Sequence, residues 1–111
     1  MNSKFIPVLF IIGLLLTVTE SWAKGNIVAG QQKSQVCQAC HGSDGRGTDP
    51  SYPNLAGQHA SYLSRSLQDY RSGARSNPVM ASFAKPLGDQ DIADLAAFYA
   101  SQKGLEDIRI K

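Results

Sequence analysis

The chain has 111 residues, enough for one small domain, and its formal net charge at pH 7 is only +2. So small a basic excess gives no reason to expect a nucleic-acid partner. The chain's only cysteines and histidines are Cys37, Cys40, His41 and His59, and their spacing matches no usual zinc module.

Residues 1–23 have the layout of a secretory signal peptide. Lys4 provides a short positive start, residues 5–18 are nearly all apolar, and Ser21 and Ala23 form the small-x-small pattern that precedes a cleavage site. The apolar run is short for a membrane span, which takes about 20 residues, so an uncleaved anchor is the weaker alternative. We expect cleavage near Ala23, a periplasmic location, no stable membrane insertion afterwards, and one mature domain over residues 24–111.

The apolar spacing of the mature chain predicts helices and no strands. Four helices are expected, over residues 26–40, over 58–72, around Met80 and over 89–103. Asn26 can cap the first helix, Gly73 is a natural stop for the second, and Gly88 is placed to cap the last. The predicted fold class is therefore all-α, with short helices joined by long loops.

Residues 42–57 show neither a helix nor a strand pattern. This segment is rich in residues that favour turns, namely Gly42, Gly45, Gly47, Pro50, Pro53 and Gly57. A loop this long in a small domain is often functional, and glycine allows positive φ and close approach to a flat ligand. We expect the loop to follow the edge of a cofactor, the alternative being a plain surface loop.

The motif that indicates a cofactor is Cys37-Gln38-Ala39-Cys40-His41. C-x-x-C-H is typical of covalent haem attachment. Two thiols one helical turn apart can each form a thioether with a porphyrin vinyl group, and the adjacent histidine is then held under the iron. A redox dithiol would need a βαβ context, which the sequence lacks. A structural disulfide remains as an alternative.

Met80 is the candidate for the second axial ligand. Methionine is the usual partner of histidine in cytochromes c, and Met80 is the only methionine besides Met1. It is far enough along the chain from His41 to reach the other face of a ring. The alternatives are that Met80 only fills the core, or that His59 ligates the iron. The polar neighbours of His59 are more typical of an exposed histidine.

In these residues the sequence resembles a class I c-type cytochrome, and more closely one half of the bacterial dihaem cytochrome c-four family or a monohaem relative. The likeness rests on segments 37–42, 52–58, 70–73, 77–80 and 89–102. A single Cys-x-x-Cys-His motif means that this chain is not dihaem. The resemblance implies one covalent haem c and a small fold whose N- and C-terminal helices cross, with Gly30 near Phe98 and Tyr99.

The resemblance also implies roles around the iron. His41 and Met80 would be its axial ligands, with the haem held by thioethers from the two cysteines. The Pro53 carbonyl would accept the Nδ1 proton of His41 and so orient the imidazole. Tyr70 and Asn77 would lie near the Met80 sulfur.

The expected function is that of a soluble one-electron carrier and not of an enzyme, because filled axial positions leave no site for a substrate. Its partners would be redox proteins, such as a terminal oxidase, a quinol-oxidising complex or a dehydrogenase. The alternatives are the haem subunit of a dehydrogenase complex and a peroxidase or gas-binding haem protein. A basic group flanks Met80 and would either offset haem propionates or dock an acidic partner; its members are Arg65, Arg71, Arg75 and Lys85.

Overall fold

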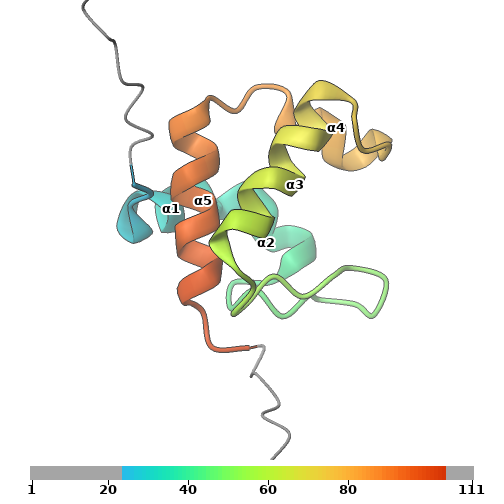
Figure 1. The fold of residues 1–111 in the computed structure, drawn as a ribbon. Helices are drawn as coiled ribbons and strands as arrows, with labels where there is room; N and C mark the ends of the chain where they lie inside the picture. The colour runs from blue at the N-terminus through green and yellow to red at the C-terminus, as the bar shows by residue number, and fades with distance from the viewer. Residues whose placement is uncertain (1–23, 105–111) are drawn as a thin grey trace, which may run out of the picture.

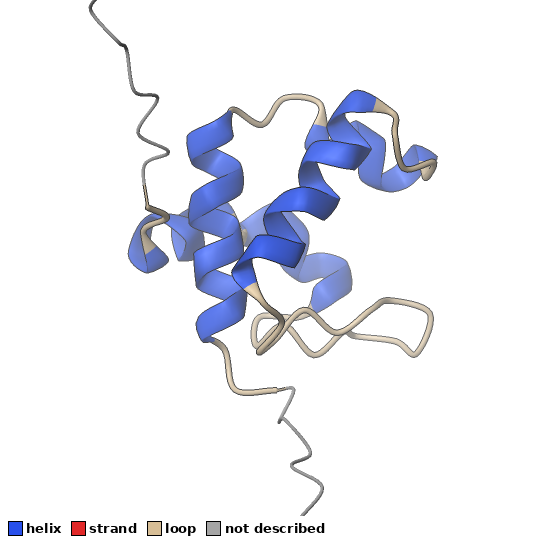
Figure 2. Ribbon diagram, in the orientation of Figure 1, coloured by secondary structure: helices blue, strands red, loops and turns tan. Residues whose placement is uncertain are grey.

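A computed structural model describes residues 24–104, and within that range the chain is helical and has no strand (Figures 1 and 2). The helices are α1 (Ile27–Lys33), α2 (Gln35–His41), α3 (Ala60–Ser72), α4 (Pro78–Ala84) and α5 (Asp89–Ser101). The all-α prediction is confirmed. No helix in this part of the chain has the length and apolarity to cross a membrane. The predicted signal peptide and the residues after 104 lie outside the described range.

The prediction of one continuous helix over residues 26–40 is wrong, because Ser34 separates α1 from α2. Ser34 is fully buried, and its hydroxyl donates to the Gln31 carbonyl at 2.7 Å and accepts from Gln38 Nε2 at 2.9 Å. Such local side-chain bonds compete with regular helix geometry. The break divides the segment that packs on α5 from the segment that carries the cysteines.

The expected helix ends are mostly where the sequence placed them. The Asn26 side chain accepts from the Ala29 amide at 2.9 Å, Gly73 ends α3 with φ 85°, and the Gly88 amide donates to Asp91 Oδ2 at 2.9 Å. The second and fourth predicted helices, over residues 58–72 and 89–103, are shorter than expected. His59 takes the N-cap position of α3, and the extended backbone of Gln102 ends α5 at Ser101.

Helix α1 crosses α5 at very short range (Figure 1). A Cβ atom added to Gly30 would lie 2.0 Å from the Asp94 carbonyl oxygen and 2.7 Å from the Phe98 Cβ. The predicted helix crossing beside Phe98 is confirmed, although Tyr99 is not among the atoms nearest to Gly30. Gly25 is a second close approach that was not expected from the sequence, because a Cβ atom added there would lie 2.0 Å from the Ala93 carbonyl oxygen.

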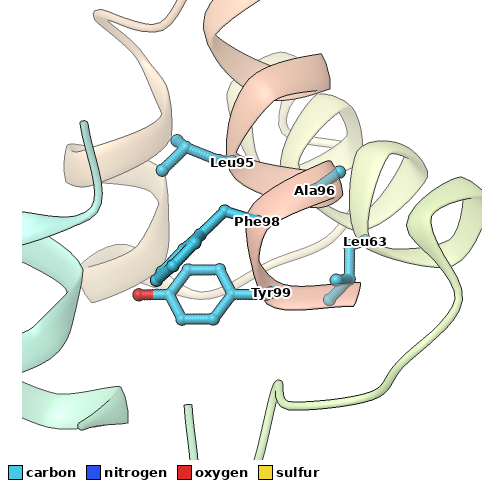
Figure 3. Packing of buried hydrophobic residues seen from close by; sticks show 5 residues of the cluster. All are labelled: Leu63, Leu95, Ala96, Phe98 and Tyr99. Carbon is cyan, nitrogen blue, oxygen red and sulfur yellow. The ribbon is translucent and has the colours of Figure 1, made fainter. Parts of the chain in front are cut away.

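The apolar core is small and comes mainly from α5. Its main cluster joins Leu63 of α3 to four side chains of α5, namely Leu95, Ala96, Phe98 and Tyr99 (Figure 3). The rings of the two aromatic residues are tilted, with centroids 5.0 Å apart. So small a core contributes limited stability by itself. Helix α5 is therefore the element against which both α1 and α3 are placed.

A buried carboxylate fastens α1 to α5. Asp94 is only 2% exposed and accepts hydrogen bonds from the Asn26 amide at 2.8 Å, Lys33 Nζ at 2.7 Å and Gln90 Nε2 at 2.8 Å. The bond from Lys33, followed by the one from the Asn26 backbone, lowers the pKa of Asp94. The ionised carboxylate is therefore stabilised in the folded state, and it provides the acceptor for all three donor groups.

We predict that Asp94→Asn lowers the free energy of unfolding at pH 7 by about 1.5–3 kcal/mol, the usual contribution of a hydrogen bond to a charged group. Because the folded-state pKa is lowered, this stabilisation is present above the unfolded-state pKa of about 3.9 and is lost as pH falls through the folded-state value. Denaturant unfolding across pH should show a shallower acid loss for the variant. Asp89→Asn, on a side chain 69% exposed, is the control and should have little effect.

We also predict that Gly30→Ala destabilises the protein by about 3 kcal/mol or more, because the new methyl group would meet a backbone oxygen that cannot rotate away. Denaturant unfolding measures this. The control is Gly88→Ala, whose Cβ would be 3.4 Å from the flexible Asp91 carboxylate and should cost about 1 kcal/mol. Equal effects of the two variants would contradict the close crossing.

Candidate functional site

A cavity of about 410 Å³ lies between α2, the following loop, α3 and α4, with α5 forming part of its wall. The structure brings every predicted site residue to this cavity: Cys37, Cys40, His41, Pro53, Tyr70, Asn77 and Met80. These residues are spread over much of the sequence. Exposed His59, the alternative ligand, is not among the lining residues.

Exposed apolar side chains border the cavity. Of the large apolar residues that are exposed in residues 24–104, most line this cavity: Val36, Tyr52, Tyr62, Val79 and Phe83, with exposed fractions of 41–63%. Isolated exposed apolar residues are common, but a ring of them around one cavity indicates a ligand or partner. A large, flat, mostly apolar group such as a porphyrin fits this lining.

Cys37 and Cys40 lie on α2 with their thiols free and half-buried, and both line the cavity. Burial raises the pKa of Cys37, only partly offset by the nearby Tyr99 hydroxyl. Reactive redox cysteines have lowered pKa values instead. The surroundings of Cys37 are therefore unlike those of a reactive redox thiol.

His41 is the last residue of α2 and is 7% exposed. Its Nδ1 lies 2.9 Å from the Pro53 carbonyl oxygen. A carbonyl can only accept, so Nδ1 carries a proton, and in the neutral ring the unprotonated nitrogen is then Nε2. That tautomer is the one that can ligate a metal, and the carbonyl fixes the plane of the ring.

The loop between α2 and α3 is pinned to the rest of the fold. The Gly47 amide donates to the His41 carbonyl at 2.7 Å, the Leu55 amide to the Gly45 carbonyl at 2.7 Å, and the Gly57 amide to the Tyr99 carbonyl at 3.0 Å. Gly47 has φ 70°, and a Cβ there would lie 2.7 Å from the Tyr52 carbonyl oxygen. These bonds hold Pro53 beside the imidazole of His41. They favour a loop with a role in the site over the alternative of a plain surface loop.

Met80 lies in the first turn of α4, half-buried, on the cavity. The Asn77 side-chain oxygen accepts from the amides of Val79 and Met80, each at 3.0 Å, and Pro78 begins the helix. The Asn77 cap and Pro78 together fix the start of α4 and therefore the backbone position of Met80. The Asn77 oxygen is thus occupied by these two amides, and the expected place of Asn77 beside the Met80 sulfur stays a prediction.

Two cavity residues have features that the sequence analysis missed. The Tyr99 hydroxyl is buried with no hydrogen-bond partner in residues 24–104, and burial, together with the neighbouring Cys37 sulfur, raises the pKa of Tyr99. An orphaned polar atom beside Cys37 is consistent with a bound group in the cavity. The Arg75 guanidinium lies 4.8 Å from the centroid of the Tyr70 ring. From the sequence, Tyr99 was expected only as a neighbour of Gly30, and Arg75 only as one of four cations that flank Met80.

Comparison with known proteins gives matches over most of the described chain. The family model described as "Cytochrome c" matches residues 27–103. Cytochrome c-554(548) of Halomonas halodenitrificans is 49% identical over 82 residues, covering 71% of this chain and 99% of that relative. Cytochrome c4 of Pseudomonas aeruginosa is 42% identical, covering 93% of this chain but 50% of its own length.

A solved structure agrees with the sequence matches. The crystal structure of reduced recombinant cytochrome c4 from Pseudomonas stutzeri superposes with a TM-score of 0.69 at 43% identity, covering 73% of this chain and 47% of the other. The chain thus spans about half the length of the cytochrome c4 proteins that it matches. With the Cys-x-x-Cys-His motif on α2, these matches show that the chain belongs to the cytochrome c family, has the class I fold, and takes one covalent haem c as its cofactor.

Proposed function

We propose that this chain is a soluble, periplasmic one-electron carrier, made by export and removal of residues 1–23. In this proposal Cys37 and Cys40 hold the haem, and His41 and Met80 are its axial ligands. The observation that carries the proposal is the convergence of these four residues on one apolar cavity. The family match supports electron transfer in general, and the finer assignments are ours.

The bound haem would supply reversible one-electron chemistry at its iron, and the chain's own residues would tune that chemistry. The bond from His41 Nδ1 to the Pro53 carbonyl makes the imidazole a more basic ligand. A methionine ligand and an apolar surround both raise the reduction potential, the second because burial disfavours the extra positive charge of ferric haem. With both axial positions filled, no position is left for a substrate, so the proposed protein is not an enzyme.

A specific observation favours one kind of partner. A relative from Stutzerimonas stutzeri, named "Thiosulfate dehydrogenase electron acceptor", is 36% identical over 102 residues and covers 87% of this chain and 47% of the relative. This name supports the second candidate function, in which the chain accepts electrons from a dehydrogenase. Co-purification with a larger catalytic subunit separates that function from a freely diffusing carrier.

We predict that the exported protein, oxidised and reduced, has a haem c spectrum and a matching pyridine haemochrome, because the haem is attached through thioethers. The oxidised form should also show the weak long-wavelength band of sulfur bound to ferric iron. A haem c spectrum without that band would contradict Met80 ligation and favour the peroxidase or gas-binding alternative. A protein without haem would overturn the proposed function.

We predict that Met80→Ala removes the long-wavelength band, allows carbon monoxide to bind the ferrous protein, and lowers the reduction potential substantially, since axial ligand choice spans roughly 0.8 V. The matched control is Val79→Ala, which shortens a neighbouring, exposed side chain that lines the same cavity. The control should keep the band and exclude carbon monoxide. Loss of the band in both variants would indicate a general disruption of α4 instead of a lost ligand.

A further inference from the structure

The lining of the cavity carries a single permanent charge. Among its lining residues there is no lysine, aspartate or glutamate, and the only arginine is Arg75. Haem c carries two propionate carboxylates, so a haem in this cavity brings negative charge to a largely uncharged lining. A buried or half-buried carboxylate is costly unless a cation or hydrogen-bond donor accompanies it.

The fold holds Arg75 in place at the cavity wall. Gly73 takes φ 85° at the end of α3, so the chain turns back, and the Arg75 amide donates to the Asp69 carbonyl at 3.1 Å. The guanidinium then stacks on the Tyr70 ring at 4.8 Å and its Nη1 donates to Ser66 Oγ at 3.4 Å. Stacking on an aromatic face uses one surface of the guanidinium and leaves its in-plane N–H groups for a carboxylate.

The other arginines of the basic group are already paired. Arg65 binds Asp69 at 3.0 Å, and Arg71 binds Asp89 at 2.6 Å and the Leu87 carbonyl at 2.9 Å. Arg75 has no carboxylate partner anywhere in residues 24–104. The four flanking cations are therefore not equivalent: two are neutralised on the surface, Lys85 is not a cavity residue, and Arg75 alone lines the cavity.

We propose that Arg75, held on Tyr70, is the counter-charge of a haem propionate and a determinant of the reduction potential. This inference rests on the proposed haem site. A positive charge beside the ring disfavours the ferric state, which carries one more positive charge than the ferrous state. Arg75 is exposed in the polypeptide itself, but it lines the cavity, and a haem there would exclude water from the inner side of the guanidinium. The guanidinium would then be screened less than a cation on the open surface. Arg75 is thus a positioning and electrostatic residue of the site, touching the haem periphery and not its iron.

The test is the midpoint potential of the purified holoprotein in three variants, at about 0.5 M salt to screen surface charges. Arg75→Gln should lower the potential, changing the equilibrium constant for reduction by about threefold to tenfold, where tenfold is 59 mV for one electron. Arg75→Lys, which keeps the charge, should recover most of the difference. Arg65→Gln is the matched control, because it removes the same charge from a side chain 76% exposed and paired with Asp69; it should leave the potential nearly unchanged.

The visible spectrum of each variant keeps the outcomes separate. A parent with the haem c spectrum and an Arg75→Gln variant with unchanged potential would overturn the Arg75 assignment alone. If that variant kept its potential but reduced an acidic partner protein more slowly, Arg75 would be a docking residue instead. Equal shifts of the midpoint potential in Arg75→Gln and Arg65→Gln would show a general effect of net charge and would also overturn the Arg75 assignment. A parent without haem c would overturn the proposed function itself.

Discussion

The close crossing of α1 and α5 at Gly30 is the contact on which the remaining structure depends. Without a side chain at this position, the two backbones approach closely enough for Asp94 to reach the Asn26 amide and for Lys33 to reach Asp94. That crossing fixes α5. Helix α5 also packs against α3, and its residues Leu95, Ala96 and Tyr99 line the cavity. The cysteine-bearing α2 follows α1 after the break at Ser34, so the crossing also sets where the cofactor is attached.

The cavity is best understood as a part of the core that the polypeptide does not fill. The chain buries few large side chains of its own, and it leaves exposed a ring of valines and aromatic residues around one opening. Covering those side chains with a porphyrin would remove apolar surface from water at roughly 25 cal/mol per Å². The same group therefore supplies both the redox chemistry and much of the burial that a domain of this size needs. Stability and function are coupled in this fold for that reason.

The sequence predicts those parts of the structure that depend on neighbouring residues. The Cys-x-x-Cys-His spacing is local and sufficient to indicate haem, and the caps at Asn26, Gly73 and Gly88 are local signals too. The helix break was not predictable in this way, because it depends on the burial of Ser34 and the bonds its hydroxyl makes. Nor was the role of Asp94 predictable, because nothing in its neighbouring residues indicates that its carboxylate is buried. Its burial follows from contacts with α1, more than sixty residues earlier.

The same distinction between local and long-range information explains the unequal support of the two proposed iron ligands. His41 ends α2, is 7% exposed, and is held by a carbonyl from a loop that is itself bonded to α5. Met80 lies on a one-to-two-turn helix which, among the helices of residues 24–104, packs only against α3 and is fixed by the Asn77 cap. Elements with fewer packing contacts open at lower free energy. The histidine side of the site is therefore part of the structural core, whereas the methionine side depends on local capping and on the ligand bond that we propose.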